Sequence, residues 1–560
     1  MWQYRDEESR RQGIVFVFVL WTTLGALNLV MPDVPLLPGA SVDLTAVAMR
    51  TSCSGLLAIL AAHSAMSLRS LVLNFRAGAN SDPISIARRW RLFLAFFVPV
   101  ALVLLAWWAG EWPGHWKTDE AYLYQQAVQG QAEPWLSTAY SIYAITVLRT
   151  LGNYTVISLV NCVVIAAVIA DVLSLLVFAG LKRWIAVVLL VLACTSVPLG
   201  LLATSLSHDI LSATLKLCLV ALVTRCVVRR AVSPRGVMPT SVLQHAFLLT
   251  LFAVALRGEN IVLVLVVPLI LVLTRAIRPV QALALCVVLI AGAWLFKGPL
   301  SRDLARPNPD RENRYTLTLV INPLSYYLAN NYWSPTPDAD RAVLAKVVDL
   351  DELARYHTPY DIQTYWIGAS HGDVTKDEMR DVKRLFVRAT LDNPGLFLSS
   401  RVATVSGMLG MTPRSNLWFY DHREQRPLDQ YAASNPPMQR AFDDGYVWSE
   451  RPGLIARCAH AARDWSAPRG WTSPGQWIWN AWPALLIMIG ALASARRTPR
   501  TALVACVIAG PFALVALAGP ASHFKYIYDL YAVGFLLPAL WVWERSLRVK
   551  RWTPPATGRA

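Results

Sequence analysis

Two adjacent carboxylates, Asp119 and Glu120, stand just beyond a long apolar run from Leu92 to Gly110. They stand in the stretch Trp116 to Tyr122 and open a short predicted helix there, since acidic residues are typical of a first helical turn. Backbone N–H groups at such a turn keep a carboxylate ionised. A carboxylate held in this way at a membrane edge can take the proton of an acceptor hydroxyl during group transfer. An ordinary helix cap explains the same pair, and the residues leave open which of the two would be the base.

A second group of charges begins another apolar run, at Ser207-His208-Asp209. Lys216 follows Asp209 by seven residues, so both side chains lie on one helix face, two turns apart. A lysine so deep in an apolar helix is costly, and it marks either a functional site or a paired charge that orients helices. The residues alone favour neither interpretation.

Two further turns carry groups suited to phosphate. Arg257-Gly258-Glu259-Asn260 offers a guanidinium, which binds phosphate through two parallel hydrogen bonds. An arginine at a membrane edge also commonly extends its charge to water without binding a ligand. The stretch His523 to Asp529 offers Lys525 and Tyr526, which can neutralise and hydrogen-bond a leaving phosphate or simply anchor a helix end.

These groups need elements that position them, and the composition indicates a membrane bundle. Of 560 residues, 55% are hydrophobic and only 16% are charged, whereas soluble proteins carry about 25% charge. Helical spans need runs of roughly 20 apolar residues. Twelve runs are predicted to span, at about 14–31, 44–66, 92–110, 154–178, 184–205, 210–228, 241–257, 260–275, 280–297, 479–495, 501–519 and 529–546.

The basic residues orient this predicted bundle. Lys and Arg crowd alternate connections, as at Arg88–Arg91, Arg229–Arg230 and Arg496–Arg497, and such an excess marks the cytoplasmic side. The same distribution explains the net charge of +16 without a nucleic-acid partner. Both termini are then predicted to be cytoplasmic, and Asp119 and Glu120 extracytoplasmic.

The predicted domains follow from these spans. Residues 1–297 form a transmembrane bundle with an outer catalytic loop at 111–154, residues 298–478 an outer soluble domain, residues 479–548 the C-terminal spans, and residues 549–560 a cytoplasmic tail. The segment Gly298 to Asn480 holds 21 basic and 21 acidic residues, which fits a folded domain. Within it, Thr375 and Glu378 form a capping box at a helix start, and a second helix is expected from Pro394 to Met411. Two short amphipathic helices, Asp119 to Gln129 and Ser137 to Leu151, are expected in the membrane interface.

The layout resembles the GT-C superfamily of membrane glycosyltransferases, which includes protein O-mannosyltransferases, aminoarabinose transferases and serotype-converting glucosyltransferases. In that family an acidic residue in the first large outer loop is the catalytic base, and interfacial helices follow it. The resemblance covers Trp112 to about Arg278 and the last two spans. Here the acidic pair follows the third predicted span, whereas many relatives have it after the first.

The resemblance implies an all-α polytopic fold with a mostly helical outer domain, in a bacterial-type inner or plasma membrane. It implies inverting transfer of a sugar from a polyprenyl phosphate to a glycan, lipid or protein hydroxyl, with Asp119 favoured over Glu120 as the base. It leaves a divalent metal open, and no metal-ligand set is evident in the sequence. The donor or its phosphate is expected at Lys117, Asp209, Lys216, Arg257, Glu259, His523, Lys525 and Tyr526, with His208 and Tyr122 in the cavity.

Two other functions remain alternatives. An O-antigen ligase or polymerase also has many spans and a large outer loop, but it relies on Arg and His residues of that loop. A twelve-span transporter would have two similar halves joined by a long cytoplasmic link. Here the corresponding link, about Arg229 to Thr240, is short, which argues against transport.

Overall fold

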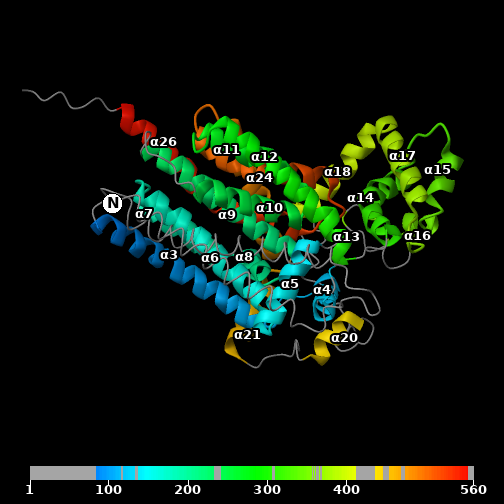
Figure 1. Cartoon of the computed structure of the whole chain (residues 1–560), viewed down its shortest axis with the longest axis horizontal. Coiled ribbons are helices and arrows are strands. Elements are labelled where there is room, and N and C mark those ends of the chain that lie inside the picture. The colour runs from blue at the N-terminus through cyan, green and yellow to red at the C-terminus, as the bar shows by residue number, and fades with distance from the viewer. Residues whose placement is uncertain are drawn as a thin grey trace, which may run out of the picture.

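The computed structural model describes residues 83–552, apart from 115, 117, 131, 133–136, 233–240, 306–308, 356, 359, 361–364, 366–368, 412–435, 445–452 and 468–472. The elements of this part are all helices (Figure 1), and the one β contact within it is an isolated bridge between Val348 and Ser370. The expected all-α class is therefore confirmed.

Seven helical stretches of the described part are long and apolar enough to cross a membrane, so the chain is that of an integral membrane protein. They comprise α3 (Pro83–Gly110), α6 (Val156–Phe178), α9 (His208–Val232), α12 (Pro279–Lys297) with α13 (Pro299–Ala305), α22 (Pro474–Ile478) with α23 (Trp482–Ala493), α24 (Pro499–Ala518), and η3 (Phe524–Ile527) with α25 (Tyr528–Val533) and α26 (Leu537–Trp552). The long helices run in roughly one direction in Figure 1.

The expected total of twelve spans is not confirmed. The predicted span at 184–205 is a pair of helices, α7 (Arg183–Cys194) and α8 (Val197–Ala203), bent by 61°, which adds an eighth span if the pair counts as one. The bend falls where Ser196 caps α8 by accepting a hydrogen bond from Leu199 N. α10 (Ser241–Leu256) and η1 (Gly258–Val262) with α11 (Leu263–Leu273) are shorter apolar helices. The runs predicted at 14–31 and 44–66 lie outside the described residues.

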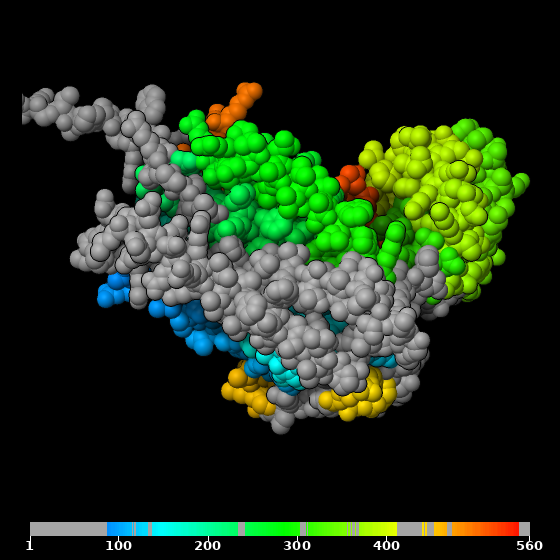
Figure 2. All heavy atoms as spheres, viewed as in Figure 1, coloured from blue at the N-terminus to red at the C-terminus, as the bar shows by residue number. Residues whose placement is uncertain are grey.

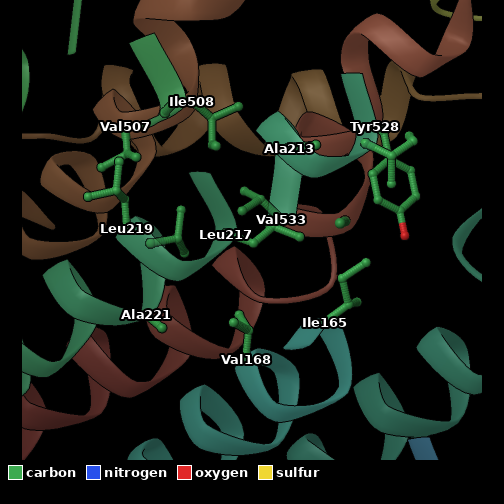
Figure 3. Close-up of a cluster of buried hydrophobic side chains, with 14 of the residues drawn as sticks. Ile165, Val168, Ala213, Leu217, Leu219, Ala221, Val507, Ile508, Tyr528 and Val533 are labelled. Carbon is green, nitrogen blue, oxygen red and sulfur yellow. The ribbon is translucent and has the colours of Figure 1, made fainter. Parts of the chain in front are cut away.

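The bundle core lies where α6, α9, α24 and α25 meet. Figure 3 shows one cluster that contains Ile165 and Val168 of α6, Leu217 of α9, Val533 of α25 and Val507 of α24, and all five side chains are buried. Apolar burial of this kind fixes which ends of the helices come together, and therefore which polar end residues can meet.

Two short helices follow α3, and the first of them carries the acidic pair. α4 spans Thr118–Gln129, and α5 spans Thr138–Leu151 with its start capped by Ser137, whose side chain accepts from Tyr140 N. Both predicted helices are confirmed to within one residue. α4 packs against α5 and against α20 (Pro436–Asp443), where Tyr124 donates a hydrogen bond of 2.9 Å to Asp444 Oδ2.

A second hydrophobic core belongs to a separate group of helices, here called the α14–α18 domain. It contains α14 (Pro309–Ala329), α15 (Pro337–Leu344), α16 (Leu350–Arg355), α17 (Lys376–Asp392) and α18 (Pro394–Met408). Figure 2 shows it as a lobe beside the bundle (yellow-green, right). The capping box of Thr375 and Glu378 is confirmed, and α18 ends three residues before the predicted Met411. A further helix outside this domain, α21 (Leu454–Trp465), packs on α3.

The approach of α8 to α3 gives the first prediction. A Cβ atom at Gly200 would lie 2.2 Å from Trp107 Cδ1, so Gly200→Ala must displace the indole ring. We expect a loss of roughly 1–3 kcal/mol, typical of overpacking, seen as a lower melting temperature of the purified protein. Gly395→Ala is the matched control, because nothing lies within 4 Å of its Cβ position. Equal melting temperatures of the two variants would contradict the close approach.

The second prediction concerns acid stability of the α14–α18 domain. Burial lowers the pKa of His357, whose Nδ1 is joined to Ser325 Oγ by a 2.8 Å hydrogen bond, from 6.5 to about 4. Between these values the unfolded chain binds a proton that the folded domain does not. The stabilisation is therefore complete above about pH 6.5 and lost as the pH falls toward 4.

We expect the melting temperature to fall more between pH 7 and pH 5 in the wild type than in His357→Gln, which cannot titrate in this range. An identical pH dependence in both proteins would show that His357 is not held neutral by the fold.

Candidate active site

Asp209 is the centre of a charged cluster at one end of the bundle. It stands in the first turn of α9, where free backbone N–H groups favour a negative charge. Its own N–H donates to Ser207 Oγ, and Ser207 Oγ donates to Asp209 Oδ2 at 3.1 Å. The side chain is only 1% exposed, so its charge depends on nearby cations.

Lys525, in η3, is the first of these cations and links Asp209 to the acidic pair of α4. Its Nζ atom lies 3.1 Å from Asp209 Oδ2 and 3.6 Å from Asp119 Oδ2. The lysine side chain is 5% exposed. One buried ammonium group thus holds together the starts of α4 and α9, which come from distant parts of the sequence.

Arg257, just before η1, is the second cation. Its guanidinium forms ion pairs with Asp209 and Glu259 and lies over the ring of Tyr526, 4.8 Å from the centroid. His523 stacks on the ring of Tyr526, with the two ring centroids 5.2 Å apart. The two predicted phosphate turns therefore meet at one place.

His208 completes the wall of the cluster. Its Nε2 atom lies 3.3 Å from Asp209 Oδ1, and its ring lies 6.2 Å from the ring of Tyr140 in α5. The side chain is 15% exposed, compared with 1% for Asp209. The His208 side chain is therefore more accessible to solvent than the Asp209 carboxylate that it contacts.

The two acidic residues of α4 differ sharply in exposure. The Asp119 side chain is 42% exposed, whereas Glu120 is 2% exposed. Tyr124 of α4 contacts Trp116 and Tyr154, and the three ring centroids lie 5.3–5.4 Å apart. A molecule arriving from solvent can reach the carboxylate of Asp119 but not that of Glu120.

The turn that carries Lys525 is fastened to the α14–α18 domain. Arg401 of α18 donates 2.8 Å hydrogen bonds to Gly519 O and to Asn322 Oδ1 of α14. Ser522 N donates to Tyr360 O at 2.8 Å, and Ser522 Oγ donates to Thr404 O at 2.6 Å. The position of Lys525 therefore depends on this domain as well as on the bundle.

Lys216 forms an internal ion pair, which is the alternative to donor binding that its position in the sequence left open. Its Nζ atom lies 2.8 Å from Asp529 Oδ2, with side chains 4% and 5% exposed. The pair joins α9 to α25 inside the bundle. The sequence shows that Lys216 needs a partner but not that the partner is Asp529, although Asp529 stands only four residues after Lys525.

Two predicted site residues remain. Tyr122 of α4 is half-buried and packs against the bundle core, and Lys117 lies outside the described residues.

Among the residues that the structure describes, no three His, Cys, Asp or Glu side chains converge in a way that could hold a metal ion. Between Asp119 and Asp209 stands the ammonium group of Lys525.

Sequence reasoning also overlooked Arg401 and Ser522. Neither belongs to a recognisable motif, and their role depends on the contact between two segments that the sequence does not bring together. The only local sign of a role for Arg401 is that it is the one charged residue in the helix 394–408.

The geometry combines an accessible carboxylate, two cations and two further carboxylates. Lys525 and Arg257 stand among Asp119, Asp209 and Glu259. This arrangement can remove a proton at Asp119 and can stabilise negative charge developing a few ångströms away at the cations. Comparison of the chain with protein-family models, curated proteins and solved structures finds no match. The functional argument therefore depends on the site itself.

The buried pair of Lys216 and Asp529 gives the third prediction. Lys216→Met leaves the Asp529 carboxylate without its cation, and breaking a buried pair in this way costs about 3–5 kcal/mol. The double variant Lys216→Met with Asp529→Leu removes both charges and should recover most of the lost melting temperature. Additive losses in the double variant would show that the two side chains do not stabilise each other.

Proposed function

We propose that the protein transfers a sugar from a polyprenyl-phosphate donor to an acceptor hydroxyl, with inversion, and that Asp119 is the general base. The observation that most supports this proposal is that the exposed Asp119 carboxylate lies 3.6 Å from the buried ammonium group of Lys525. A group that accepts a proton and a group that stabilises an anion thus stand side by side, as this reaction requires.

The reaction assigns a role to each group. The acceptor oxygen attacks the anomeric carbon while its proton passes to Asp119. The bond from that carbon to the phosphate oxygen breaks, and the electron pair leaves with the phosphate. Lys525 and Arg257 stabilise the phosphate charge, and Tyr526 donates a hydrogen bond to it.

The ion pairs set a condition for donor binding. In the structure Arg257 is paired with Asp209 and Glu259, and Lys525 is paired with Asp209. A phosphate must take over part of these contacts, which favours the doubly charged leaving group over the singly charged diester of the donor. Stronger binding of the charge that develops during reaction is the source of catalysis.

The surroundings fit the same proposal. The distribution of Lys and Arg over the connections supports an extracytoplasmic position for this end of the bundle, where lipid-linked sugars would serve as donors. The donor tail lies among the spans, and the α14–α18 domain, which is fastened to the turn of Lys525, selects the acceptor. Glu120 lies on the buried side of α4 and is too far from solvent to reach an acceptor.

The test is turnover of a panel of polyprenyl-phosphate sugars, with candidate acceptor extracts, by the purified protein in lipid nanodiscs. Asp119→Asn should lower kcat by about 100-fold or more, the range typical of a lost general base. Asp377→Asn, the same chemical change at a carboxylate of α17 that is 77% exposed, should leave turnover unchanged.

Other outcomes would overturn the assignment. Equal turnover by the wild type and Asp119→Asn would move the base elsewhere, and loss of activity on replacing arginines of the large loop would favour an O-antigen ligase or polymerase. Failure with every monophosphate donor, but activity with a diphosphate-linked one, would replace the donor class.

A further inference from the structure

Helix α21 bridges the ends of two candidate spans at the site end of the bundle. A Cβ atom at Gly110, the last residue of α3, would lie 2.6 Å from Ala459 Cβ and 3.3 Å from Ile455 O. Just beyond α21, the backbone of Ser466 and Ala467 lies as close to Gly475 of α22, where a Cβ would be 2.2 Å from Ser466 O. Because α21 contacts the end of α3 and the residues just after it contact α22, the helix lies between the ends of the two spans and is part of neither.

The inward face of α21 is small and polar. Ala456 and Ala459 are buried, and Arg463 Nη1 lies 3.1 Å from Glu111 Oε2, at the end of α3. This ion pair, with the close backbone approach at Gly110, fixes the rotation of the helix about its axis. The opposite face therefore points away from the protein.

That opposite face is apolar. Leu454, Cys458, Ala461 and Trp465 follow the i, i+4, i+7, i+11 spacing of one helical stripe, and all four are exposed. Leu454 is 69% and Trp465 is 63% exposed, and Ile455 beside the stripe is 52% exposed. Figure 2 shows α21 at the surface of the molecule (amber, lower left). An exposed apolar stripe on a helix whose inner face holds an ion pair indicates an apolar partner.

The neighbouring surface identifies that partner. Leu102 of α3 and Leu486 of α23, on the candidate spans that α21 bridges, are 63% and 51% exposed. Such side chains face lipid in a membrane protein. Trp477 of α22 is 71% exposed, and tryptophan is enriched at the boundary between lipid and water. The stripe of α21 continues this surface at the level where the spans end.

We propose that α21 lies in the plane of the membrane interface, with Leu454, Ile455, Cys458, Ala461 and Trp465 inserted among the lipids of the leaflet at the site end. Exposed Arg457 stands at the edge of the stripe, where its guanidinium reaches headgroup phosphates. The helix thereby anchors Glu111, and with it the loop that leads to Asp119, at a fixed depth. This inference is independent of the reaction that the site performs.

Cys458 provides a native probe of this face. The other seven of the eight cysteines are replaced by alanine or serine, Cys458 is given a nitroxide spin label, and the protein is placed in nanodiscs of phosphatidylcholine with a minor share of phosphatidylglycerol. Collision rates of the label with oxygen, which concentrates in lipid, and with a water-soluble nickel chelate are then compared. Unchanged gel filtration and melting temperature establish that the background folds.

We expect oxygen collisions to exceed nickel collisions severalfold at Cys458. Ala339→Cys, on exposed α15 in the α14–α18 domain, is the control and should show the reverse. Ala461→Cys, on the same stripe, should repeat the result for Cys458.

Two results would overturn the proposal. Nickel accessibility at Cys458 equal to that of the control would place the stripe in water. Low accessibility to both reagents would mean that protein, such as a second copy of the chain, covers it.

Discussion

The structure of the site depends on one buried carboxylate that needs cations. Asp209 is almost fully withdrawn from solvent, and removing such a charge from water costs several kcal/mol unless opposite charges accompany it. Lys525 and Arg257 supply these charges, and each arrives from a different element, η3 and the turn before η1. Since Lys525 also reaches Asp119, the same electrostatic requirement fixes α4 against the bundle. The ends of α4, α9, η1 and η3 cannot separate without exposing an uncompensated charge to an apolar surrounding.

This constraint explains how catalysis would be compatible with a buried charge network. In the proposed reaction the cations would be oriented before a donor arrives, so little reorganisation would be needed when charge develops on the leaving phosphate. Asp119 differs from the other carboxylates because it is the one substantially open to solvent. The α14–α18 domain enters the same network through Arg401 and Ser522, which hold the turn before Lys525. An acceptor seated on that domain would therefore lie against a structure whose position already depends on the charged cluster.

Much of the fold could be predicted from local patterns, because hydrophobic runs and caps are local. The starts of α4 and α5 and the capping box at Thr375 follow directly from residue types. The number of spans did not follow, since an apolar run such as 184–205 does not reveal the 61° bend at Ser196. At the site, residue types located Asp119, Arg257 and Lys525, but spacing could not show which charges would pair. Lys216 therefore met Asp529 rather than Asp209, through a contact decided only by how α9 and α25 pack.

The order of the chain has a consequence for biosynthesis. Asp119, Asp209 and Arg257 all precede Lys525 by more than 200 residues, and Lys525 stands at the start of the candidate span Phe524–Leu547. A nascent or truncated chain that lacks this span has the carboxylates and Arg257 but not the ammonium that joins α4 to α9. The cluster is therefore complete only after the span Phe524–Leu547 has been inserted. Chains that stop before this span would lack the assembled charge cluster, and their unbalanced carboxylates would mark them as incompletely folded in the membrane.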